Sequence, residues 1–374
     1  MPTKIANSSM AEPNRSMNLF HAAVAALAGM FALQAQAQEP ITLYGTIDGG
    51  IRHVTNAGAD GGNLLKMNSD GEFYNNRLGF LGREGIGGGV NVHYQLEMGW
   101  DNGTGALDND QGQLFQRYAL IGIDGPLGTV DLGRMPSLSC KVISFYEPFQ
   151  YHYVYTIPLA GASAGDESAL IPPFGTMGGT RFNNDIQYIG KANGWLVGAE
   201  YAFGETAGST RNGAAQAVAA AYIGGPLAIG GAYTLQRPDI STDGTPDYRN
   251  QQQLTVGGSY QVGAARISVG YMKAQIDAAP TTSLDAVKNL WGGVSYQLTP
   301  AATLTYGYYR TTLGMAGAEA ARRNFSILGA TYALSPRTTL YADIDRAQLG
   351  GLVSVIPGQE TDQTGISLGI SHAF

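Results

Sequence analysis

Short segments in which apolar and polar residues alternate follow one another from residue 41 to the end of the chain. Between Val90 and Met98, every even position is apolar or aromatic and every odd position is polar. The final segment, Thr364–Phe374, places Ile366 and Leu368 on one side of the pattern and ends on an aromatic residue. Because successive side chains of a strand point to opposite faces, the pattern predicts strands with one apolar and one polar face.

Sixteen strands are predicted in this way, and bacterial single-chain barrels have an even number of strands. Their predicted ranges are 41–53, 75–84, 89–100, 113–124, 128–134, 181–190, 194–203, 216–223, 227–236, 252–261, 265–273, 288–297, 302–310, 323–333, 338–346 and 364–374. Short turns that contain glycine or proline alternate with long polar links. The long links are 54–74, 101–112, 204–215, 237–251, 274–287, 311–322 and 347–363. All long links therefore lie on one side, which we expect to face outward.

The predicted strands have to form a closed structure. No apolar run after residue 37 is long enough for a transmembrane helix, which needs roughly 20 apolar residues. Within a bilayer, backbone groups can otherwise be satisfied only in a closed barrel. We therefore predict an all-β fold, a 16-stranded antiparallel transmembrane β-barrel, in which Thr364–Phe374 pairs with Ile41–His53 and removes both sheet edges. A soluble all-β protein is the alternative.

The N-terminal region predicts export. Leu19–Leu33 is a mostly apolar run, and Ala35–Ala37 fits a small-x-small cleavage site. We predict a signal peptide with an over-long start over residues 1–37 and a barrel domain over residues 38–374. A buried N-terminal helix is the other interpretation of the run.

Composition narrows the classes of function. The chain has a net charge of −7, and only 14% of its residues are charged, which argues against nucleic-acid binding because that needs basic patches. Cys140 is the single cysteine, so an intramolecular disulfide is not possible. No group of histidine, cysteine and carboxylate residues has the spacing of a metal site, and no cofactor is predicted.

One predicted link is far longer than the others. Residues 135–180 separate the strands that end at Arg134 and begin at Arg181, and a loop of this length without secondary structure needs a reason. Its aromatic residues are Phe145, Tyr146, Phe149, Tyr151, Tyr153, Tyr155 and Phe174. We expect this third outward loop to fold into the barrel, where it packs against the wall and narrows the aqueous pore that 16 strands leave.

Several motifs occur in the order found in one family. They are 41–50 (ITLYGTIDGG), 76–89 (NRLGFLGREGIGGG), 95–97 (QLE), 114–119 (LFQRYA), 128–134 (GTVDLGR), 181–188 (RFNNDIQY) and the terminal Phe374. Through them the chain resembles the general-diffusion porins of Gram-negative outer membranes, of the beta-proteobacterial type. The resemblance implies a homotrimer in the cell outer membrane, in contact with lipid and lipopolysaccharide. It also implies that Phe374 is part of the signal read by the outer-membrane assembly machinery.

Alternation places basic side chains on the polar, inward face. Arg77 and Arg117 lie out of phase with the apolar positions beside them, which for Arg117 are Tyr118 and Leu120, and Arg181 lies in phase with polar residues. A charge on the lipid face would cost roughly 2–4 kcal/mol at mid-bilayer, so we expect these arginines to point into the lumen. The resemblance implies a basic cluster of the pore constriction at the same positions.

Arg134 is predicted as a fourth basic residue of the constriction, and anchoring of the long loop is its alternative role. The predicted acidic side of the constriction is sparse, with Glu147, Asp166 and Glu167 in the long loop and Asp48 on the wall. A ring of arginines selects anions, whereas a ring of carboxylates selects cations. The excess of arginine over acid predicts a weak preference for anions.

These observations together predict an outer-membrane porin that forms a water-filled channel for passive diffusion of ions and small hydrophilic solutes. A substrate-specific channel for a sugar or an organic anion is the alternative, with the loop tyrosines as a stacking track. An outer-membrane barrel enzyme is a third class. His93 shares a face with Glu97, four positions along, but lining of the lumen explains this pair better than a catalytic dyad.

Overall fold

The computed structural model describes residues 41–57, 61–68, 73–109, 112–153, 156, 180–237, 250–277, 284–351 and 360–374. The predicted signal peptide, residues 1–37, lies outside this part of the chain, and so do Asp166 and Glu167. Within the described ranges, no helix is long and apolar enough to cross a membrane.

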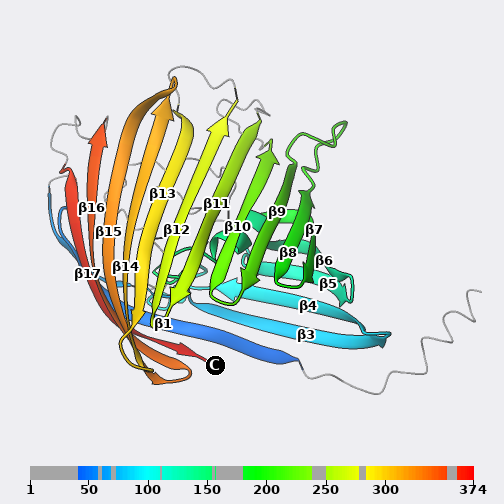
Figure 1. Ribbon diagram of the computed structural model, residues 1–374, viewed down its shortest axis with the longest axis horizontal. Coiled ribbons are helices and arrows are strands. Elements are labelled where there is room, and N and C mark those ends of the chain that lie inside the picture. The colour runs from blue at the N-terminus through cyan, green and yellow to red at the C-terminus, as the bar shows by residue number, and fades with distance from the viewer. Residues whose placement is uncertain are drawn as a thin grey trace, which may run out of the picture. The chain divides into compact units, whose positions relative to one another are not determined.

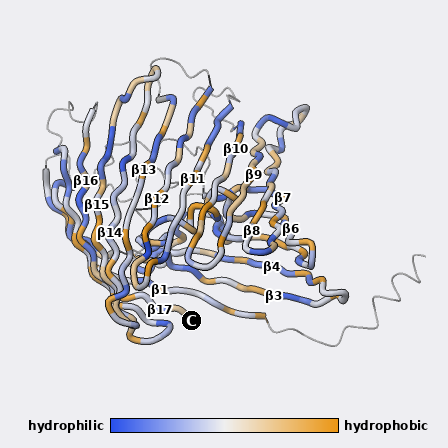
Figure 2. Tube along the Cα trace, in the orientation of Figure 1, coloured by the Kyte–Doolittle hydropathy of each residue, from blue (hydrophilic) through white to orange (hydrophobic). Residues whose placement is uncertain are grey.

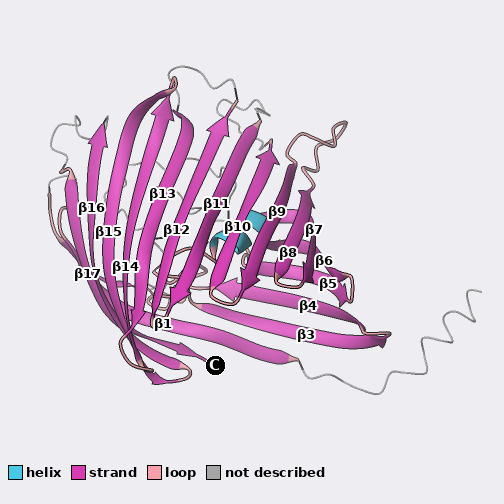
Figure 3. Ribbon diagram, viewed as in Figure 1, coloured by secondary structure: helices cyan, strands magenta, loops and turns pink. Residues whose placement is uncertain are grey.

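Strands make up most of the described chain (Figure 3). They are β1 (Thr42–Val54), β2 (Leu64–Asn68), β3 (Arg77–Gly87), β4 (Val90–Gly99), β5 (Tyr118–Gly125), β6 (Gly128–Pro136), β7 (Arg181–Ala192), β8 (Trp195–Ala202), β9 (Ala215–Gly224), β10 (Leu227–Gln236), β11 (Gln251–Val262), β12 (Ala265–Ile276), β13 (Leu284–Gln297), β14 (Ala302–Met315), β15 (Ala318–Ser335), β16 (Thr338–Gly351) and β17 (Asp362–Ala373). A short helix, α2 (Leu138–Ile143), follows β6. The predicted all-β class is confirmed.

The strands close into a ring. β1 pairs with β17 on one side, in a register that runs from Thr46 opposite Ala373 to Val54 opposite Gly365, and with β2 and β3 on the other. β2 and β3 occupy successive stretches of the same position beside β1, so the 17 strands of the described sheet fill 16 positions. From β3 onward, each strand pairs antiparallel with the next (Figure 1). The predicted 16-stranded antiparallel barrel is therefore confirmed, including closure between its first and last strands.

The two faces of the wall differ as the alternation predicts. In β17, Ile366, Leu368 and Ile370 are about half exposed on the outside, whereas Ser367 and Ser371 are buried on the inside. Figure 2 shows hydrophobic and hydrophilic residues interleaved along the strands. An apolar outer band of this kind is what a barrel presents to lipid.

Several strand ends differ from the prediction, and in three places the difference changes the predicted loops. β5 begins at Tyr118, five residues later than expected, because the residues before it form turns. β2 forms inside the predicted link 54–74. The predicted long link 311–322 is wrong, because β14 and β15 continue to a two-residue turn at Ala316 and Gly317. Their positive φ values, 52° and 80°, match the right-handed twist of a tight hairpin.

The C-terminus is tied into the wall. Phe374 and Gly45 exchange both backbone hydrogen bonds, at 3.1 and 3.2 Å, and the Phe374 ring occupies the place where a Cβ atom of Gly45 would lie. The terminal aromatic residue therefore extends the pairing between β17 and β1 to the end of the chain.

Candidate functional site

The long loop between β6 and β7 lies against the inner wall from its first residues. Ser137 caps α2, because its hydroxyl accepts a hydrogen bond from the Cys140 backbone N–H at 3.3 Å. The Leu138 backbone N–H donates to the Glu200 carboxylate on the inner face of β8 at 3.0 Å. The helix also contacts β9, β10 and β11. The part of the loop that the structure describes from residue 135 to residue 153 is therefore inside the barrel.

Aromatic side chains fill the space between this loop and the wall. Tyr146 has no exposed surface, stacks on Trp291 of β13 with ring centroids 5.9 Å apart, and shares a hydrogen bond with the Thr255 hydroxyl at 2.9 Å. Phe149 and Tyr153 are also buried and pack edge to face at 5.2 Å. The aromatic residues of the loop therefore belong to the hydrophobic core of the protein.

Six glycines of the inner wall lie directly against side chains of the loop, and we refer to them as the glycine seam. Leu138 lies against Gly198 of β8, Val142 against Gly230 of β10, Tyr146 against Gly257 of β11, Pro148 against Gly293 of β13, Phe149 against Gly307 of β14 and Tyr153 against Gly329 of β15. A Cβ atom added at any of them would lie 2.3 to 3.1 Å from the loop side chain, which is too close for most of these contacts to survive unchanged. Glycine inside a strand is otherwise unfavourable, and such positions mark close approach of another group.

Glu147 is buried between the loop and the wall and does not face the open lumen. Its carboxylate accepts hydrogen bonds from the Tyr309 hydroxyl of β14 and from the Tyr151 backbone N–H, the latter at 3.0 Å. The Arg266 guanidinium donates to the backbone carbonyl groups of Phe145 and Glu147, at 2.8 and 3.2 Å. Burial raises the pKa of the Glu147 carboxyl to about 7, against the lowering effect of its hydrogen bonds. The predicted role of Glu147 as an acid at the constriction is therefore not the one that this placement supports.

On the wall from β3 to β7, the structure brings Arg77, Arg117 and Arg181 together as a basic row. Arg117 forms an ion pair with Glu97 of β4, with 2.7 Å between Nε and Oε1. The Arg181 Nε donates to the Arg117 carbonyl at 2.9 Å, and its Nη1 donates to the Thr180 hydroxyl at 3.2 Å. The guanidinium groups of Arg77 and Arg181 each repel that of Arg117. In the described residues only Arg117 of the three has a carboxylate at ion-pair distance, so the row keeps a positive charge.

An aromatic stack connects the basic row to the loop. The Arg77 guanidinium lies over the Tyr74 ring, 3.9 Å from its centroid. The Tyr74 ring stacks in turn on His152 of the loop at 4.8 Å. Burial lowers the pKa of His152, and Arg77 lowers it further, so the imidazole is neutral near pH 7. The loop thus meets the basic row through uncharged rings, which add no negative charge to it at this contact.

Arg117 reaches the lumen for a different reason from the one predicted. The prediction took Leu120 as lipid-facing, but Leu120 is buried on the inside, and Ile121 and Ile123 are the exposed positions of β5. Arg117 precedes β5 and lies in a turn, so the alternation of the strand does not extend to it. For Arg77 and Arg181, the phase argument agrees with the burial of Gly79 and Asp185, two and four residues along the same strands.

Arg134 does not belong to the basic row. It is directly opposite Ala119 in the pairing of β5 with β6, so both side chains share one face. Ala119 shares that face with Ile121, which is 54% exposed on the outside of the wall, and Arg134 shares it with Leu132, which is 44% exposed. Its strand position points Arg134 outward, which does not support the predicted place at the constriction, but its charge repels that of Arg181 in the basic row.

The two predicted acids that the structure describes, Asp48 and Glu147, do not form an acidic wall opposite the arginines. Asp48 has no exposed surface, because the segment with Phe73 and Tyr74 covers it, and it accepts a hydrogen bond from the Tyr341 hydroxyl at 2.9 Å. Glu147 is buried as described above. Asp166 and Glu167 lie outside the described residues.

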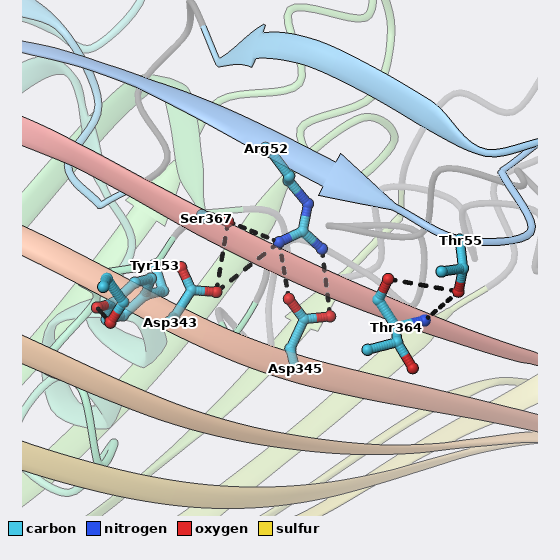
Figure 4. Close-up of polar contacts among 8 residues, drawn as sticks. Arg52, Thr55, Tyr153, Asp343, Asp345, Thr364 and Ser367 are labelled. Atoms are coloured by element: carbon cyan, nitrogen blue, oxygen red, sulfur yellow. Dashed lines mark hydrogen bonds and ion pairs between the residues drawn. The ribbon is translucent and has the colours of Figure 1, made fainter.

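A second arginine network, which was not predicted, joins the first strand of the sheet to the last two (Figure 4). Arg52 of β1 reaches across β17 to Asp345 of β16, with Nη1–Oδ2 and Nη2–Oδ1 distances of 2.7 and 3.2 Å. On the way, its Nη1 donates to the Ser367 hydroxyl of β17 at 2.9 Å and lies 3.8 Å from Asp343. A Cβ atom at Gly365 would collide with this guanidinium, so the glycine leaves the passage free. All three charged groups are buried, and the network therefore links three strands at the closure.

Other candidate chemistry is weaker. His93 contacts Asp131, with 2.8 Å between Nε2 and Oδ1, and not Glu97, which is bonded to Arg117. No group of three or more histidine, cysteine and acidic residues in the described chain could hold a metal ion. Cys140 lies on α2, and its carbonyl accepts from the Tyr151 hydroxyl at 2.7 Å.

The sequence contained a signal for the glycine seam that the prediction did not use. Glycines are abundant, but those of the seam share the phase of inward-facing polar or aromatic residues, as Gly257 does with Thr255 and Gly293 with Trp291. Glycine at an inward position of a strand is itself an indication that another group approaches the backbone closely. The partner of Arg52, in contrast, is 293 residues away along the chain and has no local signal.

Comparisons with known proteins agree with the fold and the motifs. A family model described as Gram-negative porin matches residues 23–351. An outer membrane porin protein of Bordetella pertussis is 27% identical over 400 residues, covering 94% of this chain and 98% of that protein. Outer membrane porin protein 32 of Delftia acidovorans is 27% identical over 370 residues, covering 91% and 95%. The solved structure of an anion-selective porin from Comamonas acidovorans is similar with a TM-score of 0.71 and 24% identity, over 90% of this chain and 99% of that one.

Proposed function

Because the chain belongs to the Gram-negative porin family, we propose that it forms a water-filled channel for ions and small hydrophilic solutes, with a weak preference for anions. The family and the named relatives make it an outer-membrane β-barrel protein and a channel rather than an enzyme. Passage through such a channel is passive diffusion, and its selectivity follows from the charges that line the narrowest part.

The basic row carries the proposed preference for anions. Among the described residues, Arg77 and Arg181 donate hydrogen bonds only to neutral acceptors, and Glu97 is the one carboxylate paired with Arg117. Glu147, the loop acid in the described segment, points into the wall instead of toward the row. A cation in the passage therefore meets net positive charge, whereas an anion is attracted by it. The similar porin from Comamonas acidovorans is described as anion-selective, which supports the same preference here.

The burial of the loop tyrosines favours a general channel over a substrate-specific one. A stacking track for a sugar needs aromatic faces that are open to the passage. Tyr146 and Tyr153 are buried against β11 and β15, and their rings lie where Cβ atoms of Gly257 and Gly329 would be. These two residues serve packing and leave no face for a solute.

The proposal includes the assembly that the family resemblance implies. We expect a homotrimer of independent pores, inserted with the help of the outer-membrane assembly machinery and surrounded by lipid and lipopolysaccharide. Closure of single channels in three equal steps is the expected recording, and one-step closure would contradict the trimer.

Reversal potential across a planar bilayer with a KCl gradient tests the selectivity. The expected result is a potential of the sign that chloride permeation produces, which becomes smaller as salt rises and screens the arginines. A potential of the opposite sign, showing preference for potassium, would contradict the proposal.

A further inference from the structure

Three carboxylates lie close together on the inner wall beside α2, and we refer to them as the acidic patch. They are Asp131 of β6, Asp185 of β7 and Glu200 of β8, and at most 8% of any of them is exposed. Strand pairing brings them together, because Asp131 is opposite Gln187 and Gln187 is opposite Glu200. Asp185 lies two residues before Gln187, on the same face of β7. The patch therefore crosses three neighbouring strands.

Hydrogen bonds compensate the acidic patch only in part. The Glu200 carboxylate accepts from the Gln187 amide at 2.7 Å. One oxygen of Asp131 lies 2.8 Å from Nε2 of His93. Among the described residues, neither carboxylate oxygen of Asp185 has a side-chain hydrogen-bond partner. Because a buried carboxylate is costly unless it is paired, the patch needs a cation nearby.

Lys141 of α2 supplies this cation. Its Nζ donates a hydrogen bond to the side-chain oxygen of Gln187, whose amide nitrogen donates in turn to Glu200. Burial lowers the pKa of the Lys141 ammonium, and the three carboxylates of the acidic patch oppose this lowering. The charge of Lys141 acts in return on both Asp185 and Glu200. One lysine of the loop therefore offsets part of the negative charge of the wall.

The acidic patch and Lys141 lie beside the basic row. Asp185 and Arg181 are four residues apart on β7, which is roughly 13 Å along a strand. The Cys140 thiol, next to Lys141 on α2, is acted on by the positive charges of Arg181, Lys141 and Arg117 together. Charges at such separations act on the same permeating ion, most strongly when little salt is present to screen them.

We propose that Lys141 is a specificity-determining residue of the channel, because it offsets the acidic patch and so lets the basic row set the sign of the ion preference. Without Lys141, three carboxylates next to the arginines would attract cations into the same passage. The opposition of patch and row also accounts for a preference that is only weak. The inference rests on the proposed function, a channel with anion preference, and adds a residue of the loop to the arginines of the wall.

Reversal potential in a KCl gradient at low salt and mildly alkaline pH, where carboxylates are charged and lysine is protonated, tests the inference. Lys141→Met should lower the ratio of chloride to potassium permeability about threefold, as expected for one unit charge near the passage, and less at high salt. Lys141→Arg should keep the ratio of the wild type, because it keeps the charge. Adding Asp185→Asn to Lys141→Met should restore the ratio, because it removes one carboxylate together with the lysine. Asp185→Asn would not correct a displaced loop.

Lys191→Met is the matched control. Lys191 has the same phase on β7 as Asp185, but it is exposed at the turn end of the strand, six residues away. This variant should keep the ratio of the wild type, whereas Asp185→Asn alone should raise it.

Three results would overturn the inference: an unchanged ratio in Lys141→Met, an equal fall in Lys191→Met, or no recovery in the double variant. If Lys141→Met does not fold, as judged by heat-dependent gel mobility, an unchanged ratio in Asp185→Asn alone would overturn it. A wild type that prefers potassium would contradict the proposed function instead, and the differences between variants would still test the role of Lys141.

Discussion

The inner wall of this barrel has two halves that are built in opposite ways. From β3 to β7 it carries long charged side chains, and the basic row of Arg77, Arg117 and Arg181 lines the passage. From β8 to β15 it carries the glycine seam, on which the long loop lies. In the first half the features of interest are charged side chains of the wall. In the second half they are glycines, whose lack of a side chain lets the loop lie close to the wall.

The difference separates two properties of such a channel, the width of its opening and its selectivity for charge. The glycine seam sets how closely the loop can approach the wall, and therefore how much of the lumen remains open in front of the basic row. On the function that we propose, the arginines select the sign of charge that passes through that opening. Pore width and charge selectivity would then depend on different residues, and we expect them to respond separately to substitution.

The largest effect is expected at the closure of the ring, where Arg52 of β1 reaches Asp345 of β16. Arg52→Met removes the buried ion pair with Asp345, and loss of one partner of a buried ion pair typically costs about 3–5 kcal/mol. The fraction of barrel that survives in urea, followed by its shift in gel mobility, measures this loss.

Arg346→Met is the control for the closure network. Its ion pair with Asp362 has side chains that are 56% and 45% exposed, and exposed pairs contribute about 0–1 kcal/mol. Similar losses for the two variants would show that closure does not depend on the buried network.

The next effect concerns the pH dependence of loop docking through Glu147. The pKa of Glu147 is raised from 4.5 to about 7 in the docked loop, so the protonated form is favoured by docking. Docking is therefore strongest below about pH 4.5 and weakens as the pH rises to about 7, by on the order of 3 kcal/mol. Open-channel current noise should increase over this range as the loop becomes more mobile. In Glu147→Gln the noise should not change with pH between these limits. If the noise of this variant rose with pH as it does in the wild type, Glu147 would be excluded as the responsible group.

A smaller effect is expected from filling the glycine seam. Gly293→Val places a side chain where Pro148 now lies, at 2.7 Å from a Cβ atom, and overpacking of this kind costs about 1–3 kcal/mol. The loop should shift away from the wall, and single-channel conductance should change without a change of selectivity.

Gly292→Val is the matched control for this substitution. Gly292 is the neighbouring residue on the outward face of β13, where a Cβ atom would meet only the Ser268 carbonyl oxygen at 3.5 Å. Its conductance should equal that of the wild type. If both variants changed conductance alike, the effect would come from the backbone of β13 and not from the seam.

The smallest energetic effect is expected from substitution of single arginines in the basic row. Arg181→Gln removes one of the two charges of the row that have no ion-pair partner among the described residues. In a water-filled passage this corresponds to about 1 kcal/mol for an ion at contact distance. Reversal potential in a KCl gradient should move toward zero while conductance changes little. Arg134→Gln removes the same charge from the outer face and should leave the reversal potential unchanged; an equal shift in both variants would contradict the division between lumen and outer wall.

Much of the fold was predictable from local patterns. The strands of β17 and β1 were expected within one or two residues, and their pairing was also expected, because alternation over ten residues specifies both the strand and its lipid-facing side. The pattern failed at strand ends. Arg117 lies in a turn where alternation stops, and Arg134 lies beside an irregular pairing of β6 with β7 between Gly133 and Met135.

The candidate site was predictable only in part. Arg77 and Arg181 were expected on the inward face, and the structure brings them to Arg117. Glu147 was expected to face them, but a loop residue has no fixed phase, and its contacts with Tyr309 and Tyr151 place it against the wall. Residue type alone therefore could not distinguish an acid of the passage from an acid that anchors the loop.

The sequence by itself determined the class of fold, the number of strands in the ring and the lipid-facing side of strands such as β1 and β17, although not that of β5. These properties depend on neighbouring residues, because side chains alternate with every step along a strand. The tertiary structure alone decided where the loop rests, that Arg52 is matched by Asp345, and that Arg134 faces outward. Each of these depends on the register of strands or loops that are distant in the chain, and register sets which side chains meet only after the barrel has closed.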